Sequence, residues 1–230
     1  MNVIYAVTAD YQQRILPSVR SLLEHNPDAN VWILTETHDV KGLPCEANVI
    51  NVEGQDIFPE DGANYKNRFT YINLLKVYYP YFVDEDKIIH LDADTIICDS
   101  LEPIWDIDLT DKWVAACPEY TGRYKPFGDL YYNMGVAVLN LKQLRADGIV
   151  PLMVEYLNKI AGPWADQDAW NYFMLKADKA VPFDVRFNEN FATGYTDNPA
   201  VVHFCGIPDW WTNHNMKRRE FLDRYLPPLK

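Results

Sequence analysis

Cysteine is scarce in this sequence, with four residues in 230 and no Cys-x-x-Cys pair. A disulfide framework would show more cysteines in a shorter chain, so we expect free thiols. Long apolar runs are absent too, and none approaches the roughly 20 residues of a membrane span. The N-terminal MNVIYAVTAD lacks the basic start and long apolar stretch of a signal peptide. We therefore expect no integral membrane segment and a cytoplasmic location.

Positive charge is also in short supply. The chain has 21 Lys and Arg residues against 33 Asp and Glu, a formal net charge of -12. Such a surface repels phosphate backbones and anionic membranes, so general nucleic-acid binding is not expected. An anionic ligand can still bind where a metal ion and a few local cations neutralise it. The acidic excess thus argues for a metal wherever phosphate is held.

Linkers rich in glycine, serine or proline are missing, so we expect a single domain over residues 1–230. Short apolar runs alternate with amphipathic stretches, and Pro80 is expected to close one of the helices. The expected strands lie at residues 2–8, 31–35, 48–52, 88–91, 113–117 and 134–141. The expected helices lie at about 15–23, 69–79, 150–157 and 215–225. This order indicates an α/β sandwich with a mixed sheet.

The acidic motif Asp92-Ala93-Asp94 comes directly after an apolar strand. In open α/β sheets ligands gather beyond the carboxyl ends of strands. Two carboxylates one residue apart cannot both be buried there unpaired. A Mg²⁺ or Mn²⁺ ion that links them to a diphosphate would resolve this. The alternative is a solvated acidic turn, because Asp-x-Asp is common by chance.

A second motif, VVHFCG at 201–206, ends a strand on a histidine. His203 could supply an imidazole ligand to the same ion, and Gly206 would let backbone approach a phosphate closely. The alternative is a core histidine whose hydrogen bonds are satisfied.

Two further motifs carry polar side chains. Asn133 and Gly135 precede a buried strand, where a carboxamide could hold sugar hydroxyls or simply form a turn. In WADQDAWN, either Asp166 or Asp168 could cap a helix. The functional alternative is that Asp166 binds sugar hydroxyls and Gln167 lies near the reactive carbon of that sugar.

In this order, IYAVTAD, HLDADTII, YYNMGVAVLNL, WADQDAWN and HFCGIPDWW resemble the motifs of the family 8 glycosyltransferases, and they span nearly the whole chain. The resemblance implies a GT-A-like, Rossmann-type sandwich with a mixed central sheet. It implies a retaining transfer of a hexose, glucose or galactose, from a UDP-sugar with Mn²⁺ or Mg²⁺. Nucleotide binding would fall in about residues 1–100, and sugar and acceptor binding in about 101–230.

The resemblance also implies roles for individual residues. Asp92, Asp94 and His203 would ligate the metal. Gln167 would sit beneath the anomeric carbon, with Asp166 as the second catalytic residue. Thr8 and Asp10 would lie by the uracil and ribose, Lys76 by the diphosphate or sugar, and Asn133 and Asp166 by sugar hydroxyls. The full set expected to contact the donor is Thr8, Asp10, Lys76, Asp92, Ala93, Asn133, Gly135, Asp166 and Gly206.

Two positions depart from the family pattern. Asp209 stands where a lysine that touches the diphosphate is expected, and Lys76 replaces an arginine and so loses bidentate geometry. One hypothesis is that Lys217, Arg218 or Arg219 folds back to compensate. The basic cluster Lys217, Arg218, Arg219 and Arg224 could also touch membrane or nucleic acid. Because Glu220 and Asp223 are interleaved and the whole chain is acidic, a solvated helix is the favoured interpretation of this cluster.

Several alternatives remain open at this point. A metal-dependent nucleotidyltransferase or phosphohydrolase also uses paired carboxylates. The Gly-rich loop that nucleotidyltransferases often carry near the first strand is not seen here. A nucleotide-sugar-binding protein with lost or only hydrolytic activity is the second alternative. The acceptor could be a saccharide, a lipid-linked sugar, a protein or a modified nucleobase. The aromatic residues that could stack on it are Tyr120, Tyr124, Phe127, Trp210 and Trp211.

Overall fold

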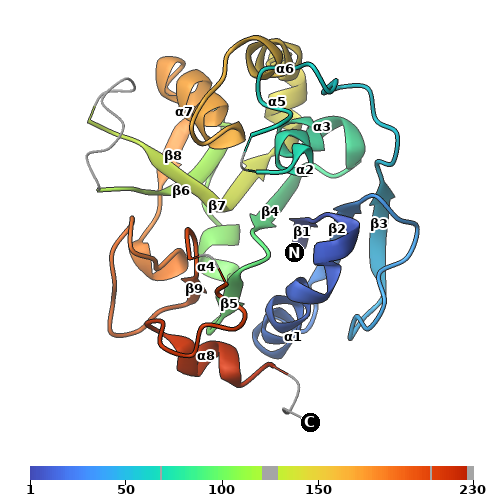
Figure 1. The fold of residues 1–230 in the computed structure, drawn as a ribbon. Helices are drawn as coiled ribbons and strands as arrows, with labels where there is room; N and C mark the ends of the chain where they lie inside the picture. The colour runs from blue at the N-terminus through green and yellow to red at the C-terminus, as the bar shows by residue number, and fades with distance from the viewer. Residues whose placement is uncertain (68, 121–128, 208, 227–230) are drawn as a thin grey trace.

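The computed structural model describes residues 1–67, 69–120, 129–207 and 209–226 (Figure 1). Within them, seven strands form a central sheet in the order β3-β2-β1-β4-β7-β6-β8. The strands are β1 Asn2–Ala6, β2 Asn30–Thr35, β3 Ala47–Asn51, β4 Lys87–Leu91, β6 Val114–Pro118, β7 Tyr132–Asn140 and β8 Ala180–Pro182. Strands β1 to β4 pair in parallel, whereas β7 is antiparallel to both β4 and β6. The expected mixed sheet is therefore confirmed.

A second, two-stranded sheet pairs β5, Thr95–Ile97, with β9, Val201–His203, in antiparallel fashion. The chain leaves the central sheet at the end of β4 and enters β5 after only three residues. Those three residues are the acidic motif 92–94, which therefore lies at the junction of the two sheets (Figure 1).

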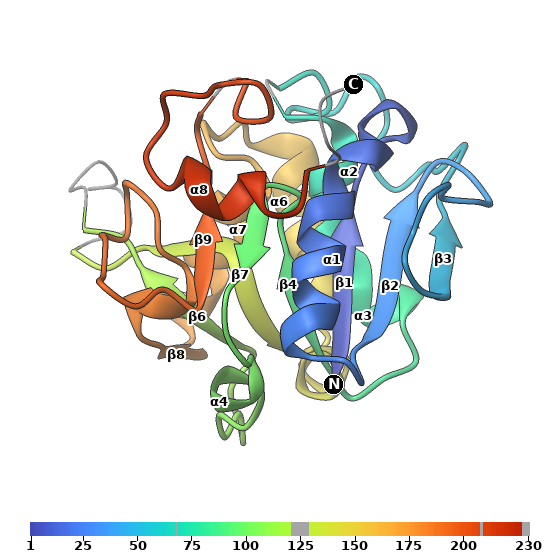
Figure 2. The ribbon, with the colours of Figure 1, turned by 90° about the horizontal axis from the view of Figure 1, so that it is seen from below.

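Helices cover both faces of the central sheet. They are η1 Ala9–Ile15, α1 Leu16–His25, α2 Tyr71–Leu74, η2 Leu75–Tyr78, α3 Tyr79–Phe82, α4 Glu102–Trp105, α5 Leu141–Asp147, α6 Val150–Lys159, α7 Asp166–Lys176, η4 Val185–Phe187 and α8 Arg219–Asp223. Helix α1 lies along β1 (Figure 2), and its Val19 and Leu22 share a core with Val3 and Tyr5. The opposite face packs on α2, α3 and α5 to α7. No helix among the described residues is long and apolar enough to cross a membrane.

Two of the expected helices differ from the prediction. The segment 69–79 is not one helix but a short α2, a 3-10 turn and α3, and Pro80 lies in the first turn of α3 instead of closing a helix. Proline lacks the N–H that an interior helical position needs, but it fits a first turn. The last helix is also shorter than expected and begins at residue 219, because Arg218 has a left-handed backbone with φ 69°.

The strand order gives the sheet a topological switch point at β1. Strand β1 lies between β2 and β4, so the direction in which strands are added reverses there. Ligands of open α/β sheets bind at such a switch point, beyond the carboxyl ends of the strands. Thr8, which follows β1, and Asp92, which follows β4, are thereby placed at the same edge.

Candidate active site

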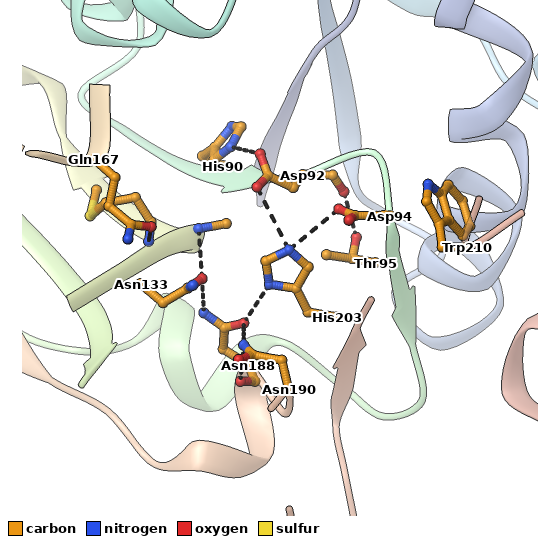
Figure 3. Close-up of polar contacts among 12 residues, drawn as sticks. His90, Asp92, Asp94, Thr95, Asn133, Gln167, Asn188, Asn190, His203 and Trp210 are labelled. Atoms are coloured by element: carbon orange, nitrogen blue, oxygen red, sulfur yellow. Dashed lines mark hydrogen bonds and ion pairs between the residues drawn. The ribbon is translucent and has the colours of Figure 1, made fainter. Parts of the chain in front are cut away.

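Three potential metal ligands meet at this edge: ligand atoms of Asp92, Asp94 and His203 all lie within 4.8 Å of one another. The Nε2 of His203 is 3.3 Å from Oδ1 of Asp94 and 3.7 Å from Oδ2 of Asp92 (Figure 3). The small sheet causes this meeting, because Thr95 is the register partner of His203. The imidazole therefore lies beside the residue that directly follows the acidic motif.

Two observations show that these residues fit a divalent cation. The Nε2 of His203 is buried and makes no hydrogen bond within the described part of the chain. A Cβ added to Gly135 would lie 2.1 Å from Cε1 of His203 and 2.7 Å from Oδ2 of Asp92, so only glycine leaves the site open at this point. An imidazole nitrogen facing two carboxylates is a donor set suited to a divalent cation.

The electrostatic balance around His203 also favours a cation. Burial would lower the pKa of His203, but the carboxylates of Asp94 and Asp92 raise it above its usual value. Negative charge is thus concentrated around a nearly inaccessible ring, with the side chain 2% exposed. A metal ion that occupies this position would displace a proton from the ring.

Asp92 is held from its other side by two buried groups. Its Oδ1 accepts from Nζ of Lys76 at 2.6 Å and from Nε2 of His90 at 3.0 Å. Burial would raise the pKa of Asp92, but Lys76 and His90 hold it well below its usual range. Because Oδ1 is used in this way, Oδ2 is left to face His203.

His90 is a site residue that the sequence interpretation missed. Burial, with a contribution from Lys76, lowers its pKa to about 4, so the ring is neutral at pH 7. It donates Nε2–H to ionised Asp92, and its Nδ1 lies 3.2 Å from the hydroxyl of Tyr79. A signal was available, since residues two apart on a strand share a face and His90 precedes Asp92 by two.

Asp166 lies beyond Lys76, with 4.0 Å between its Oδ2 and Nζ. It begins α7, but neither aspartate caps this helix: the N-cap residue is Ala165, and Asp168 accepts from the backbone N–H of the preceding Trp164 at 2.9 Å. Burial raises the pKa of Asp166 to about 7, although Lys76 opposes the shift. The carboxyl therefore titrates near neutrality beside a permanent cation.

This shift predicts a pH-dependent stability. In the folded chain Asp166 has a pKa of about 7 against an ordinary 3.8. The contribution of its protonated carboxyl to the free energy of unfolding is therefore full below about pH 4 and is lost as pH rises towards 7. Asp166→Asn removes the titration. The stability of wild type relative to the variant should fall by up to about 1.4 kcal/mol per pH unit across that window. Urea unfolding of both proteins in EDTA measures this, and parallel pH profiles would contradict it.

Gln167 and Asn133 are joined through Glu119, a buried residue that the sequence interpretation gave no role. The Oε1 of Gln167 accepts from the backbone N–H of Met134 at 3.0 Å, which fixes the carboxamide. Its Nε2 lies 3.4 Å from Oε1 of Glu119, which also accepts from Nδ2 of Asn133 at 2.7 Å. The two amides expected at the sugar are thus held by one carboxylate.

The remaining residues predicted to contact the donor are Thr8, Asp10, Ala93 and Gly206, each of which lies shortly after the end of a strand. Thr8 and Ala93 are half-buried at the ends of β1 and β4, whereas Asp10 and Gly206 are exposed. Gly206 has φ 69°, and a Cβ there would lie 2.9 Å from the ring of Phe191, so a side chain would be strained and crowded. None of these four residues belongs to the cluster of Asp92, Asp94 and His203.

The C-terminal cations are engaged away from the acidic motif. Arg218 forms a bidentate pair with Glu189, and Arg219 is buried and donates to backbone carbonyls. The Nζ of Lys217 lies 3.2 Å over the ring of Tyr195. The interpretation as a solvated helix is therefore wrong for Arg219, since packing against the loop before α8 covers it.

Of the aromatic residues considered for acceptor stacking, Tyr124 and Phe127 lie outside the described residues. Tyr120 is exposed. Trp210 is buried, stacked on Phe204 with 5.9 Å between ring centroids, and its edge faces Trp211. Trp210 therefore belongs to the hydrophobic core, whereas the exposed ring of Tyr120 is accessible to a ligand.

Comparison with known proteins agrees with this architecture. The family model described as glycosyl transferase family 8 matches residues 2–214. GlyA of Streptococcus pneumoniae is 23% identical over 99% of this chain and 37% of its own length. A putative glycosyltransferase of Haemophilus influenzae is 24% identical over 92% of this chain and 73% of its own. The chain thus spans little more than a third of GlyA.

Solved structures match over nearly the full chain. An active-site mutant of LgtC has a TM-score of 0.77 at 22% identity, covering 98% of this chain and 95% of that one. The galactosyltransferase LgtC in complex with donor and acceptor sugar analogs has a TM-score of 0.76 at 21% identity, covering 99% and 98%. These likenesses establish a GT-A-like fold.

Proposed function

The chain belongs to glycosyltransferase family 8, and we propose that it transfers a hexose, glucose or galactose, from a UDP-sugar with retention of configuration. One observation carries the proposal: the buried Nε2 of His203 faces Asp92 and Asp94, at 3.7 Å and 3.3 Å, where parallel strands β1 and β4 end. Glycosyltransferase activity follows from the family. The donor, the metal and the roles of single residues are the proposal.

Asp92, Asp94 and His203 would hold Mn²⁺ or Mg²⁺. When bound, the ion supplies Lewis-acid neutralisation of the diphosphate leaving group. A chain with a net charge of -12 needs such help to hold an anion, and Asp209 stands where a lysine would otherwise assist. Lys76, whose Nζ lies 2.6 Å from Oδ1 of Asp92, would assist the ion in neutralising the diphosphate.

Three side chains would act on the sugar. Gln167, held by the N–H of Met134, presents a neutral amide beneath the anomeric carbon, where positive charge develops. Asp166 and Asn133 would bind sugar hydroxyls. Retention without a strong nucleophile fits such a weakly polar group, and a departing phosphate oxygen would accept the acceptor's proton.

The donor nucleotide would lie along the edge of the sheet at which β1 and β4 end. Thr8 and Asp10 would contact the uracil and ribose, while the backbones of Ala93, Gly135 and Gly206 would approach the donor closely. We assign nucleotide binding to about residues 1–100, and sugar and acceptor binding to about 101–230. His203 would complete the metal site from this second part.

The proposal is tested by UDP release. Each common UDP-sugar is incubated with the protein and Mn²⁺, with and without chelator. We expect release from one donor, and a loss of about 100-fold or more in an Asp92→Ala, Asp94→Ala double variant, because leaving-group neutralisation contributes several kcal/mol. Asp86→Ala is the matched control, since that carboxylate lies on the surface with its side chain 69% exposed.

Other results would select an alternative. If no donor turns over and none raises the melting temperature with Mn²⁺, the transferase proposal fails. Binding without release would instead identify a nucleotide-sugar-binding protein. Release that no saccharide, lipid-linked sugar, protein or modified nucleobase accelerates would leave hydrolysis as the activity.

A further inference from the structure

The second ring nitrogen of His203 contacts an asparagine that the sequence interpretation did not consider. Nδ1 lies 2.9 Å from Oδ1 of Asn188, which is fully buried (Figure 3). A neutral imidazole, the form that binds a metal, carries its proton on only one nitrogen, and the partner of the other decides which. Since the two ends of an amide have the same shape, the network around Asn188 must establish which atom faces the ring.

One anchor of that network is a backbone N–H in β7. The N–H of Gly135 donates to Oδ1 of Asn133 at 3.0 Å, and because a backbone N–H can only donate, this atom of Asn133 must be oxygen. Asn188 meets the same oxygen at 2.9 Å and therefore presents its NH₂ group there. Its own oxygen is thereby turned towards His203.

A second anchor reaches the same conclusion from the other side. Oδ1 of Asn190 accepts from the backbone N–H groups of Ala192 at 2.8 Å and Thr193 at 3.1 Å. The NH₂ of Asn190 then lies 3.0 Å from Oδ1 of Asn188 and donates to it. Two independent sets of backbone donors thus require oxygen at the atom that faces His203.

We propose that Asn188 is a positioning residue that holds the proton of His203 on Nδ1 and leaves the lone pair of Nε2 directed at Asp92 and Asp94. We call the hydrogen bonds that run from the N–H of Gly135 through Asn133 and Asn188 to His203 the relay. Asn133 orients Asn188 within it, a role separate from any contact with a sugar. The relay is sealed from water, since Asn188, Asn190 and Asn133 are 0%, 2% and 5% exposed. The inference rests on the metal site of the proposed function.

The test uses Mn²⁺ alone, without donor, and follows free Mn²⁺ by electron paramagnetic resonance. Asn188→Leu removes both hydrogen-bonding ends at similar volume, and we expect its Mn²⁺ Kd to rise by about 10- to 100-fold. Asn188→Asp keeps an oxygen against Nδ1–H and should stay within about fivefold of wild type. A residue needed only for packing would show the reverse order, because aspartate buries a charge against the Asn133 oxygen and leucine does not.

Asn133→Leu breaks the relay one step earlier. It should raise the Mn²⁺ Kd severalfold with no sugar present, whereas a residue that only binds sugar hydroxyls would leave the Kd unchanged. The matched control is Asn64→Leu. Asn64 is as deeply buried and bonds Leu157, Ile160 and Gly162 away from the acidic motif, so its loss should not alter Mn²⁺ binding.

The outcomes separate this inference from the proposed function. If wild type does not bind Mn²⁺, the metal site and the relay both fail. If wild type binds and a folded Asn188→Leu binds equally well, only the relay is overturned. Circular dichroism establishes folding, and if Asn188→Leu does not fold, Asn133→Leu decides by the same criterion.

Discussion

A Gly135→Ala variant is expected to lose about 100-fold or more in Mn²⁺ affinity, and its UDP release with it. The added Cβ would lie 2.1 Å from Cε1 and 2.8 Å from Nε2 of His203, and 2.7 Å from Oδ2 of Asp92. The backbone cannot retreat freely, because the carbonyl of Gly135 accepts from the N–H of Asp92 at 2.7 Å. The methyl group must therefore displace the imidazole from the two carboxylates. Titration with Mn²⁺ and the UDP-release assay measure both losses.

The control for this variant is a glycine whose replacement strains the backbone far from the cluster. Gly148 ends α5 with φ 62°, and an added Cβ there meets nothing within 4 Å. Gly148→Ala should cost about 1 kcal/mol of stability and bind Mn²⁺ like wild type. If folded Gly135→Ala also bound Mn²⁺ normally, the strand would not be confining His203 and the site geometry described above would be wrong.

An Arg218→Leu variant is expected to lose about 3 to 5 kcal/mol of unfolding free energy. Glu189 is completely buried, and Arg218 meets both of its oxygens, at 2.6 Å and 3.1 Å. Removal of the guanidinium leaves the carboxylate buried, and among the described residues only the N–H of Thr196 would still donate to it. An unpaired buried charge is far more costly than a lost surface pair, and urea unfolding at pH 7 measures the difference.

Arg186→Leu is the matched comparison, since Arg186 also pairs with a carboxylate, Asp99, at 2.8 Å, but on the surface. Its loss should cost at most about 1 kcal/mol. Equal effects of the two variants would mean that burial of Glu189 carries no penalty. Because the N–H of His203 donates to the carbonyl of Glu189 at 2.9 Å, we also expect Arg218→Leu to weaken Mn²⁺ binding.

Local signals explain which elements could be predicted. Strands β1, β2, β4 and β7 are short, apolar and bounded by polar residues, so their positions followed from the sequence to within a few residues. The broken segment 69–82 could not be predicted in the same way. Proline is compatible with both the end of one helix and the start of another, and only packing decides between them.

The sequence by itself determined the mixed α/β architecture and the place of the acidic motif after a buried strand, because hydrophobic periodicity and strand ends are encoded by neighbouring residues. Only the tertiary structure decided how that site is held. His203 reaches Asp94 through the pairing of β5 with β9, Asn188 meets an Asn133 that is 55 positions away, and Glu189 finds its cation in Arg218. Such contacts depend on register and on which end of an amide faces which donor, and no local pattern in the chain specifies either.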